Sequence, residues 1–306
     1  MLFQDLRDYQ ILFLTSFLVL GIGTRDWTVR PELILIAIAT CLITQWIFSR
    51  GNQSKGDSSN SSNSNSPNSN FFSSNFSGLS FPNLDFLNSN LSIRSALITS
   101  LGLSLLLRAD HWTTIAIAGF FAIASKFIFK VGNKHFFNPA NFGIIAALIL
   151  TNDAWVSPGQ WGEDWWYAML FLGAGGMILQ KVGRWDTTAA FLGAYAVLEG
   201  IRNFWLGWTW DVYSHRLING SLLLFALFMV TDPRSIPNSR TGRVIWAICI
   251  ATLTFILRNY FLMSTAVFWA LFLLAPLTVV FDTIWSAQRF SWSSQGIGDS
   301  ILEIRD

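Results

Sequence analysis

The sequence predicts an all-α integral membrane protein with about ten transmembrane or half-spanning helices. Apolar residues make up 52% of its 306 residues and charged residues only 12%, which is about half of the charged fraction of a soluble domain. The apolar residues also recur in long runs, as expected of helices that cross a lipid bilayer. We therefore expect membrane lipid as a partner. No basic patch or zinc-ligand spacing points to nucleic acid.

The first 50 residues contain two of these runs, at 9–23 and 31–48. Pro31 begins the second run, and proline is tolerated there because the first helical N–H has no partner. The first run could be mistaken for a signal peptide, but the Thr-Arg-Asp-Trp sequence at 24–27 is no small-residue cleavage site. We predict two transmembrane helices within residues 1–50.

Residues 51–91 have a different composition, in which Ser, Asn and Gly dominate, as in the Ser-Ser-Asn-Ser-Ser-Asn sequence at 58–63. A segment of this kind buries too little apolar surface to offset its conformational entropy. We predict a disordered linker.

Residues 92–306 are predicted to form an eight-helix region. Pro276 predicts a kink in the last helix, because proline removes a helical hydrogen bond. Small residues at 173–176 (Gly-Ala-Gly-Gly) predict the close approach of another helix. Glu199 and Arg202, one turn apart, are expected to pair on the surface. The eight runs are 92–107, 112–129, 139–150, 165–179, 187–201, 217–230, 242–257 and 265–284.

The basic residues predict how the chain is oriented. With both termini in the cytoplasm, most of the 20 Lys and Arg residues fall on the inner side, as the positive-inside rule requires. Lys126 and Lys134 are expected to extend to the cytoplasmic interface. We expect an integral protein of a bacterial-type inner or plasma membrane. Tryptophans expected in an outer aromatic belt are Trp155, Trp161, Trp165, Trp166, Trp205, Trp208 and Trp210.

One segment is too short to span the membrane and too apolar for a surface loop. Residues 139–150 rise only about 18 Å as a helix, against a hydrocarbon core of about 30 Å. Asn138 suits the N-cap position and Pro139 the first helical position. These residues predict a half-helix buried among other helices, of the kind that often builds the sites of transporters.

A second short run, at 217–230, resembles the first. Each begins at an asparagine, Asn138 or Asn219, and each ends in a threonine followed closely by an aspartate. Two short segments of opposite sense are typical of inverted repeats with a site half-way through the membrane. Chance and shared helix-end chemistry are an alternative explanation, since Asn, Thr and Pro punctuate helices in general.

Such a site would have two kinds of polar group. The helix starts direct N–H groups inward, which suits a polar or anionic group such as a flavin ring edge or phosphate. The helix-end carbonyls near Thr151 and Thr231, with Asp153 and Asp232, would suit a cation; alternatively, Asp232 forms a turn and pairs with Arg234. No catalytic residue or metal site is predicted. The candidate cofactor-binding residues are Asn138, Pro139, Asn141, Asn219, Thr231 and Asp232.

Three stretches together resemble the RnfD/NqrB family: Ser125-Lys126, Lys-His-Phe-Phe-Asn-Pro-Ala-Asn-Phe-Gly at 134–143, and Phe-Met-Val-Thr-Asp-Pro-Arg-Ser-Ile-Pro at 228–237. The family comprises membrane subunits of the Rnf ferredoxin:NAD oxidoreductase and of the sodium-pumping NADH:quinone oxidoreductase. The resemblance, over residues 92–285, implies a urea-transporter-like bundle of inverted repeats. It also implies membrane-bound flavin and electron transfer coupled to sodium or proton movement.

The sequence departs from the family at the flavin attachment site. The family's flavin is attached by a phosphoester to a threonine in a Ser-Gly-Ala-Thr stretch, and no Gly-Ala-Thr occurs in this chain. The expected cofactor is therefore FMN or riboflavin that is held without a covalent bond, near the two half-helices.

Three hypotheses follow. The leading one is a membrane subunit of an RnfD/NqrB-like electron transport system, part of an ion-translocating oxidoreductase. The chain has no Rossmann fingerprint and no cysteine cluster for iron–sulfur, so other subunits would have to deliver electrons. The alternative is a stand-alone channel or transporter for a small solute. A third hypothesis is a structural subunit that anchors a partner.

Overall fold

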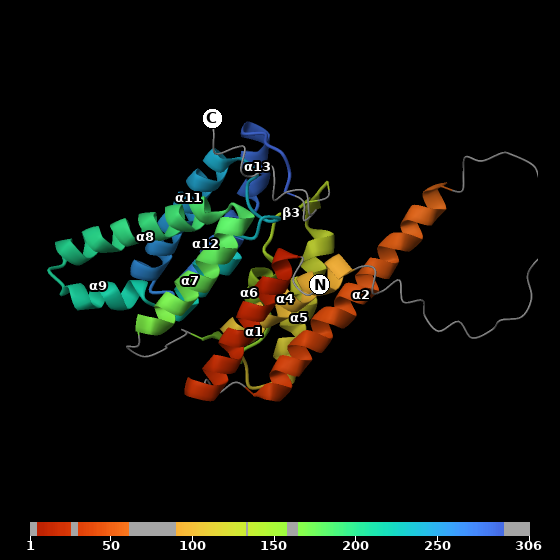
Figure 1. Ribbon diagram of the computed structural model, residues 1–306, viewed down its shortest axis with the longest axis horizontal. Coiled ribbons are helices and arrows are strands. Elements are labelled where there is room, and N and C mark those ends of the chain that lie inside the picture. The colour runs from red at the N-terminus through yellow and green to blue at the C-terminus, as the bar shows by residue number, and fades with distance from the viewer. Residues whose placement is uncertain (1–4, 26–29, 61–89, 133, 158–164, 291–306) are drawn as a thin grey trace, which may run out of the picture.

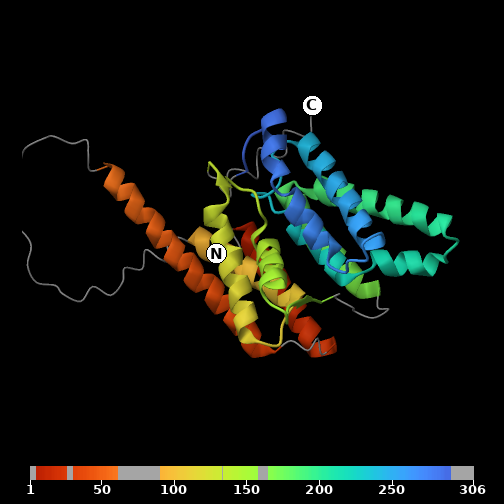
Figure 2. The same ribbon diagram turned by 180° about the vertical axis from the view of Figure 1, so that it is seen from behind.

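Two groups of helices lie side by side in the computed structural model, which describes residues 5–25, 30–60, 90–132, 134–157 and 165–290 (Figures 1 and 2). The first group contains α1 (Leu6–Arg25), α2 (Pro31–Asn60), α4 (Asn90–Leu106), α5 (Trp112–Ile128) and α6 (Pro139–Leu150). The second contains α7 (Trp165–Val182), α8 (Trp185–Trp205), α9 (Trp210–Leu217), α10 (Gly220–Leu224), the π-helical segment η1 (Phe225–Met229), α11 (Arg240–Asn259), α12 (Ala266–Leu274) and α13 (Leu277–Ile284). The chain is therefore mostly helical, as predicted.

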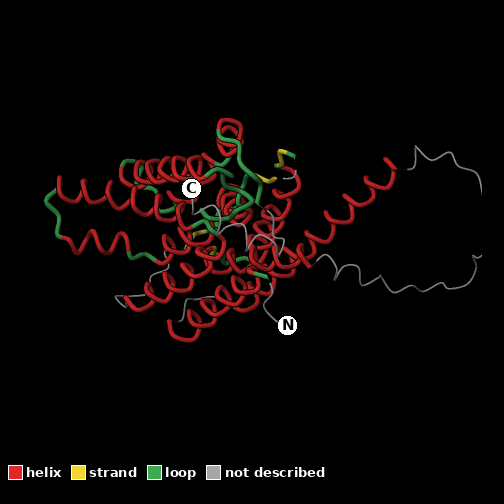
Figure 3. Tube along the Cα trace, turned by 45° about the horizontal axis from the view of Figure 1, so that its top comes forward, coloured by secondary structure: helices red, strands yellow, loops and turns green. Residues whose placement is uncertain are grey.

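The two groups are joined by packing of α12 on α6 and of α7 on α1. The helix α1 also packs on α4, and Arg94 of α4 donates to Asp8 of α1 at 2.7 Å. The two N-terminal helices are thus integrated with the region that follows the predicted linker. In the second group, α8 and α9 extend together as a hairpin (Figures 1 and 3).

Two short antiparallel ladders lie at opposite ends of α5. The strand β1 (Leu107–Arg108) pairs with β4 (Trp155–Val156), and β2 (Lys130–Val131) pairs with β3 (Lys134–His135). The first ladder ties the end of α4 to the chain that leaves α6. The second reverses the chain between α5 and α6.

Several helices are suited to a membrane. By length and composition, residues Pro31–Arg50 of α2 and the helix α11 could each cross a bilayer. Two bent pairs raise the number to four within the described residues: α9 with Gly220–Met229, bent by 47°, and α12 with α13, bent by 50°. The second bend confirms the kink predicted at Pro276. Ten spans and a urea-transporter-like bundle stay predictions.

The predicted half-helix is present with the predicted ends. The side chain of Asn138 accepts a hydrogen bond from the backbone N–H of Asn141 at 3.0 Å, and Pro139 is the first residue of α6. At the other end, the hydroxyl of Thr151 donates to the carbonyl of Ala147 at 2.7 Å. The interactions at the start of the helix are those that Asn and Pro favour.

Small residues allow close packing at two places. A Cβ at Gly143 would lie 2.5 Å from the carbonyl oxygen of Ala118, so α5 and α6 touch there backbone to backbone. A Cβ at Gly175 would lie 2.8 Å from the Leu227 side chain, which confirms that the small-residue stretch of α7 admits another helix. Gly173 and Gly176 have nothing within 4 Å.

Two predicted segments differ from the structure. The helix α2 continues to Asn60, well into the predicted linker. Residues 61–89 of the linker, and Trp161 of the predicted aromatic belt, lie outside the described residues. The second short run is not one helix: α10 is followed by the π-helical η1, in which the N–H of Val230 bonds to the carbonyl of Phe225.

Two expectations about charged residues were wrong. Glu199 is buried and accepts hydrogen bonds from Arg216 at 2.8 Å and Asn259 at 2.7 Å, so it does not form a surface pair with Arg202. Lys126 is also buried and donates to the hydroxyl of Ser95 at 3.1 Å, within the first helix group. In both cases partners from other helices outweigh the local geometry.

Candidate functional site

The two motifs that carry the family resemblance are in contact. Asn138, which begins α6, donates from its amide to the carbonyl of Met229, the last residue of η1, at 3.2 Å. Lys134 donates to the carbonyl of Ile236 at 2.6 Å. These bonds join residues that lie about 90 to 100 positions apart in the sequence.

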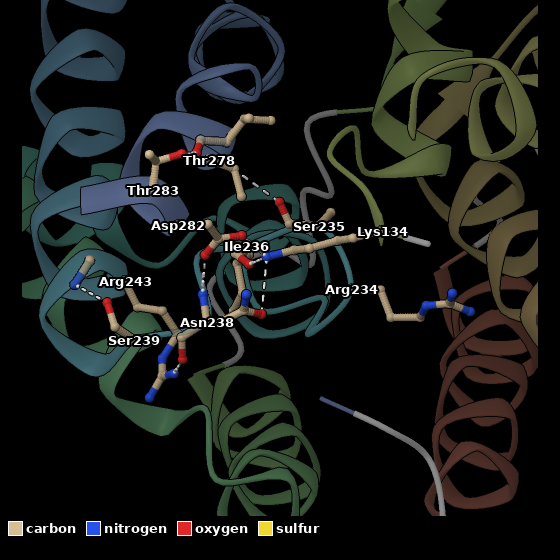
Figure 4. A network of polar contacts seen from close by, with 12 residues as sticks. Lys134, Arg234, Ser235, Ile236, Asn238, Ser239, Arg243, Thr278, Asp282 and Thr283 are labelled. Carbon is tan, nitrogen blue, oxygen red and sulfur yellow. Dashed lines mark hydrogen bonds and ion pairs between the residues drawn. The ribbon is translucent and has the colours of Figure 1, made fainter. Parts of the chain in front are cut away.

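Lys134 is the centre of a polar network (Figure 4). Its ammonium group also donates to the Asp282 carboxylate at 2.6 Å and to the Asn238 side chain at 3.1 Å. Asp282 in turn accepts from the backbone N–H of Asn238 at 2.7 Å. Burial lowers the pKa of Lys134 more than the Asp282 carboxylate raises it. Lys134 thus binds the loop at 230–239, hereafter the TDPR loop, and its position at the cytoplasmic interface stays a prediction.

A second cation, which is buried, holds the same loop. Arg243 donates to the carbonyl of Asn238 at 2.6 Å and to the Asp186 carboxylate at 2.8 Å. Both partners of this ion pair are almost completely buried. Neither Asp186 nor Arg243 was singled out from the sequence as a site residue, and a sequence pattern would not reveal a pair 57 residues apart.

Asp232 forms a turn. Its carboxylate accepts from the backbone N–H of Arg234 at 3.2 Å, and its carbonyl accepts from the N–H of Ser235 at 3.0 Å. The carboxylate also lies 3.8 Å from Nε2 of His135. Burial acts to raise the pKa of Asp232, but His135 and the Arg234 and Ser235 donors outweigh it, and the pKa is lowered. Asp232 is therefore ionised at neutral pH.

A cavity of about 110 Å³ lies beside this contact, between α1, α4, α7 and η1. Asn138, Pro139, Thr231 and Asp232 line it, together with Arg234, which points away from the Lys134 network in Figure 4. Other polar residues on its wall are Arg7, Gln10, Ser95, Thr99 and His135. Most of the remaining wall is apolar. The structure thus brings four of the six candidate residues to one cavity.

The other two candidates lie elsewhere. Asn141 is buried and donates to the carbonyl of Phe268 on α12 at 3.1 Å, so it joins the two helix groups. Asn219 caps α10 by accepting from the N–H of Ser221 at 3.0 Å. The start of α6 therefore meets the end of η1, whereas two helix starts were expected to face a shared pocket.

The lining residues suit a flat ring with polar edges. Leu105, Ile178, Leu179 and Leu227 supply apolar walls, and the polar groups come largely from segments flanking the α6–η1 contact. The volume is several times the ~10–15 Å³ that one water molecule needs. An isoalloxazine ring has this combination of apolar faces and a hydrogen-bonding edge, so the chemistry of the lining residues suits a flavin held without a covalent bond.

Comparison with known proteins finds a family to which part of this chain is similar. The model of the NQR2, RnfD, RnfE family matches residues 147–291, which contain the TDPR loop. Over residues 147–291, this chain is similar to the NQR2, RnfD, RnfE family. The predicted RnfD/NqrB resemblance is confirmed, and with the apolar helices it makes the chain an integral membrane protein.

Curated relatives are named as subunits of an ion-translocating oxidoreductase complex. The chain is 36% identical over 102 residues to the protein of Vibrio vulnificus (strain YJ016), 32% of this chain and 28% of that one. It is 29% identical over 104 residues to that of Actinobacillus pleuropneumoniae serotype 5b (strain L20), 33% of this chain and 30% of the relative. It is 28% identical over 133 residues to the protein of Stutzerimonas stutzeri, and this match covers 42% of this chain and 36% of the relative. The matched segments thus span about a third of these relatives.

Proposed function

We propose that the chain is a membrane subunit of an Rnf-like system that couples redox chemistry to ion transport across the membrane. The observation that carries this proposal is the contact between the two motifs through Asn138 and Lys134. The names of the relatives support it. The partners would be the other subunits of such a complex, in a bacterial plasma membrane. The basic-residue distribution supports termini in the cytoplasm.

We further infer that the cavity beside the contact holds FMN or riboflavin without a covalent bond. Bound flavin would supply electron transfer. The chain's own contribution would be to hold the ring between apolar walls and to offer the Asn138 amide and the polar groups of His135 and Asp232 at its edge. The ionised Asp232 would disfavour additional negative charge close to it.

The visible absorbance of the purified full-length chain, extracted gently and then titrated with riboflavin or FMN, tests this proposal. We expect flavin absorbance in the wild type and a loss of most of it in Leu227→Trp, which fills the cavity. Asn138→Ala should also lose flavin. The matched control is Asn219→Ala, because Asn219 caps a helix in the same way but lies outside the cavity.

Each cap loss should cost about 0.5–2 kcal/mol of stability, so both alanine variants are compared at equal folded fraction. If wild type takes up no flavin, or if Leu227→Trp binds it as well as wild type, the cavity is not a flavin site. The stand-alone channel is not favoured, since the relatives are named as subunits of an oxidoreductase complex.

A further inference from the structure

A buried arginine that has no carboxylate partner in the described part of the chain lies at the opposite end of α5 from the TDPR loop. Arg108, in β1, is only 7% exposed. One terminal nitrogen, Nη1, donates to the carbonyls of Ser104 at 2.7 Å and Leu107 at 3.0 Å. The other, Nη2, is buried and has no hydrogen-bond partner among the described residues.

Burying the charged guanidinium of Arg108 without a carboxylate partner costs folding free energy. Within the described part of the chain, no carboxylate is within ion-pair distance of Arg108. Burial lowers the pKa of its guanidinium to about 10, so the group still carries its charge at neutral pH. A buried, charged donor that lacks a partner is strongly destabilising, and an anion would relieve that cost.

Arg108 lines a cavity of about 140 Å³. Its wall includes Leu33, Ile34 and Ala37 from α2, and Leu103 from α4. This volume is about ten times what one water molecule needs, ~10–15 Å³. The cavity is therefore large enough for a tetrahedral oxyanion and part of an apolar group.

The charged groups of the wall favour an anion. Arg30 and Arg108 both line the cavity, against one carboxylate, the exposed Asp110. Arg30 donates to the backbone carbonyl of Asp110 at 3.1 Å, so this contact does not use the Asp110 carboxylate. Two cations and one exposed carboxylate leave the site net positive.

We propose that this cavity, hereafter the Arg108 cavity, binds a phosphate-type oxyanion through the guanidinium of Arg108. Arginine presents a planar fork of donors that matches phosphate oxygens. The site is distinct from the cavity at the α6–η1 contact: the two share no lining residue, although α4 contributes different residues to each. Of the residues that line the Arg108 cavity, only Trp155 lies within the family match at 147–291.

The phosphate could belong to a lipid headgroup or to a free anion, and the surroundings favour the lipid. Trp155 lines the cavity and Trp112 lies two positions after the lining residue Asp110. Both tryptophans are exposed, as is typical of aromatic residues at the membrane interface. Leu35 on α2, next to Ile34, is exposed and could receive an acyl chain. An apolar wall with a cation at the headgroup level suits an amphipathic phosphoester.

Native mass spectrometry of the full-length chain in detergent, with three probes, tests this proposal. The probes are phosphatidylglycerol, inorganic phosphate, and diacylglycerol, which lacks the phosphate. We expect phosphatidylglycerol adducts in the wild type and affinity weaker by about tenfold or more in Arg108→Gln, because the variant loses charge-assisted hydrogen bonds to the phosphate. Diacylglycerol should bind no better to wild type than to the variant.

Two further variants separate binding from folding. Arg50→Gln removes an exposed arginine that stacks on Trp46 of the same helix α2, outside the cavity, and should leave binding unchanged. Ile34→Phe narrows the cavity and keeps Arg108, and should weaken binding even if Arg108→Gln does not fold. Binding of phosphate alone would assign the cavity to a free anion. The proposal is overturned if neither phosphate probe binds, or if both cavity variants bind like wild type.

Discussion

Two cations hold the TDPR loop, the partly buried Lys134 and the buried Arg243, and each of them forms an ion pair with one carboxylate. Lys134 pairs with Asp282, and Arg243 pairs with Asp186. Asp186 faces a second arginine, Arg240, at 3.8 Å, but Arg240 is 72% exposed. Because a buried ion pair is costly to break and an exposed one contributes little, the two arginines around Asp186 should differ sharply in effect.

Replacing Arg243 with methionine should destabilise the protein by about 3–5 kcal/mol, because the buried Asp186 carboxylate is left with only the exposed Arg240 as a charged partner. The matched substitution Arg240→Met should cost less than about 1 kcal/mol. Thermal unfolding in detergent compares the two. The double variant Asp186→Asn with Arg243→Met should recover part of the loss, and equal losses for both arginine variants would contradict this account.

A pH effect is expected at Asp153. Its pKa is lowered chiefly by the hydrogen bond from the Thr114 hydroxyl, joined by the backbone N–H of His111. A depressed carboxyl pKa contributes stability above the unfolded-state value of about 3.9, and that contribution is lost as the pH falls through the folded-state pKa. Asp153→Asn should therefore lower the melting temperature slightly at pH 7 and leave it unchanged well below about pH 4.

Pairing of side chains is where prediction from the sequence was weakest. Glu199 and Arg202 are neighbours on one helix, and local geometry therefore predicts a pair. The actual partners of Glu199, Arg216 and Asn259, come from α9 and α11. Such contacts depend on how helices pack, which residue spacing in one helix does not encode.

At the scale of the element, α6 was predictable because its signals are local. Asn138 and Pro139 define its start, and its short apolar length follows directly from the sequence. The contact between its start and the end of η1 was not predictable, since it joins residues 91 positions apart. The π-helical η1 was missed for a similar reason, because its irregularity leaves no mark in the apolar pattern.

The packing of α6 on α5 gives a sharp prediction. In Gly143→Ala, the new Cβ would lie 2.5 Å from a backbone carbonyl, which cannot move aside as a flexible side chain could. Overpacking of this kind costs about 1–3 kcal/mol or more. Gly173→Ala is the control, since Gly173 has open space around it and alanine favours a helix. Thermal unfolding should show a marked loss for the first variant and none for the second.

At the scale of the whole molecule, the predicted orientation places the two ladders on opposite sides of the membrane. Val131 on β2 and Trp155 on β4 are about equally exposed, at 48% and 45%. In Val131→Cys, a membrane-impermeant thiol reagent should label the chain only after the cells are opened. In Trp155→Cys it should label intact cells from which the outer membrane has been removed. Labelling of both from the same side would contradict the predicted orientation; both variants are made in a chain without Cys41 and Cys249.

The fold class was predictable because composition and long apolar runs depend only on the sequence. The arrangement of the helices in two groups was not, although the prediction of close helix contact at 173–176 correctly anticipated one junction between α7 and η1. The four candidate residues that line one cavity were identified from helix-end chemistry. Asn141 and Asn219 share that chemistry and lie elsewhere, so the chemistry alone does not locate a site.

The π-helical turn of η1 affects the direction in which the residues after it point. A π turn accommodates one residue more than an α turn. Deleting one residue within Phe225–Met229 would allow this segment to close as an ordinary α-helix. Since each α-helical residue advances the chain by about 100°, Thr231 and Asp232 would then swing away from His135. The widened turn thus acts as a spacer that sets the angle at which this carboxylate is presented.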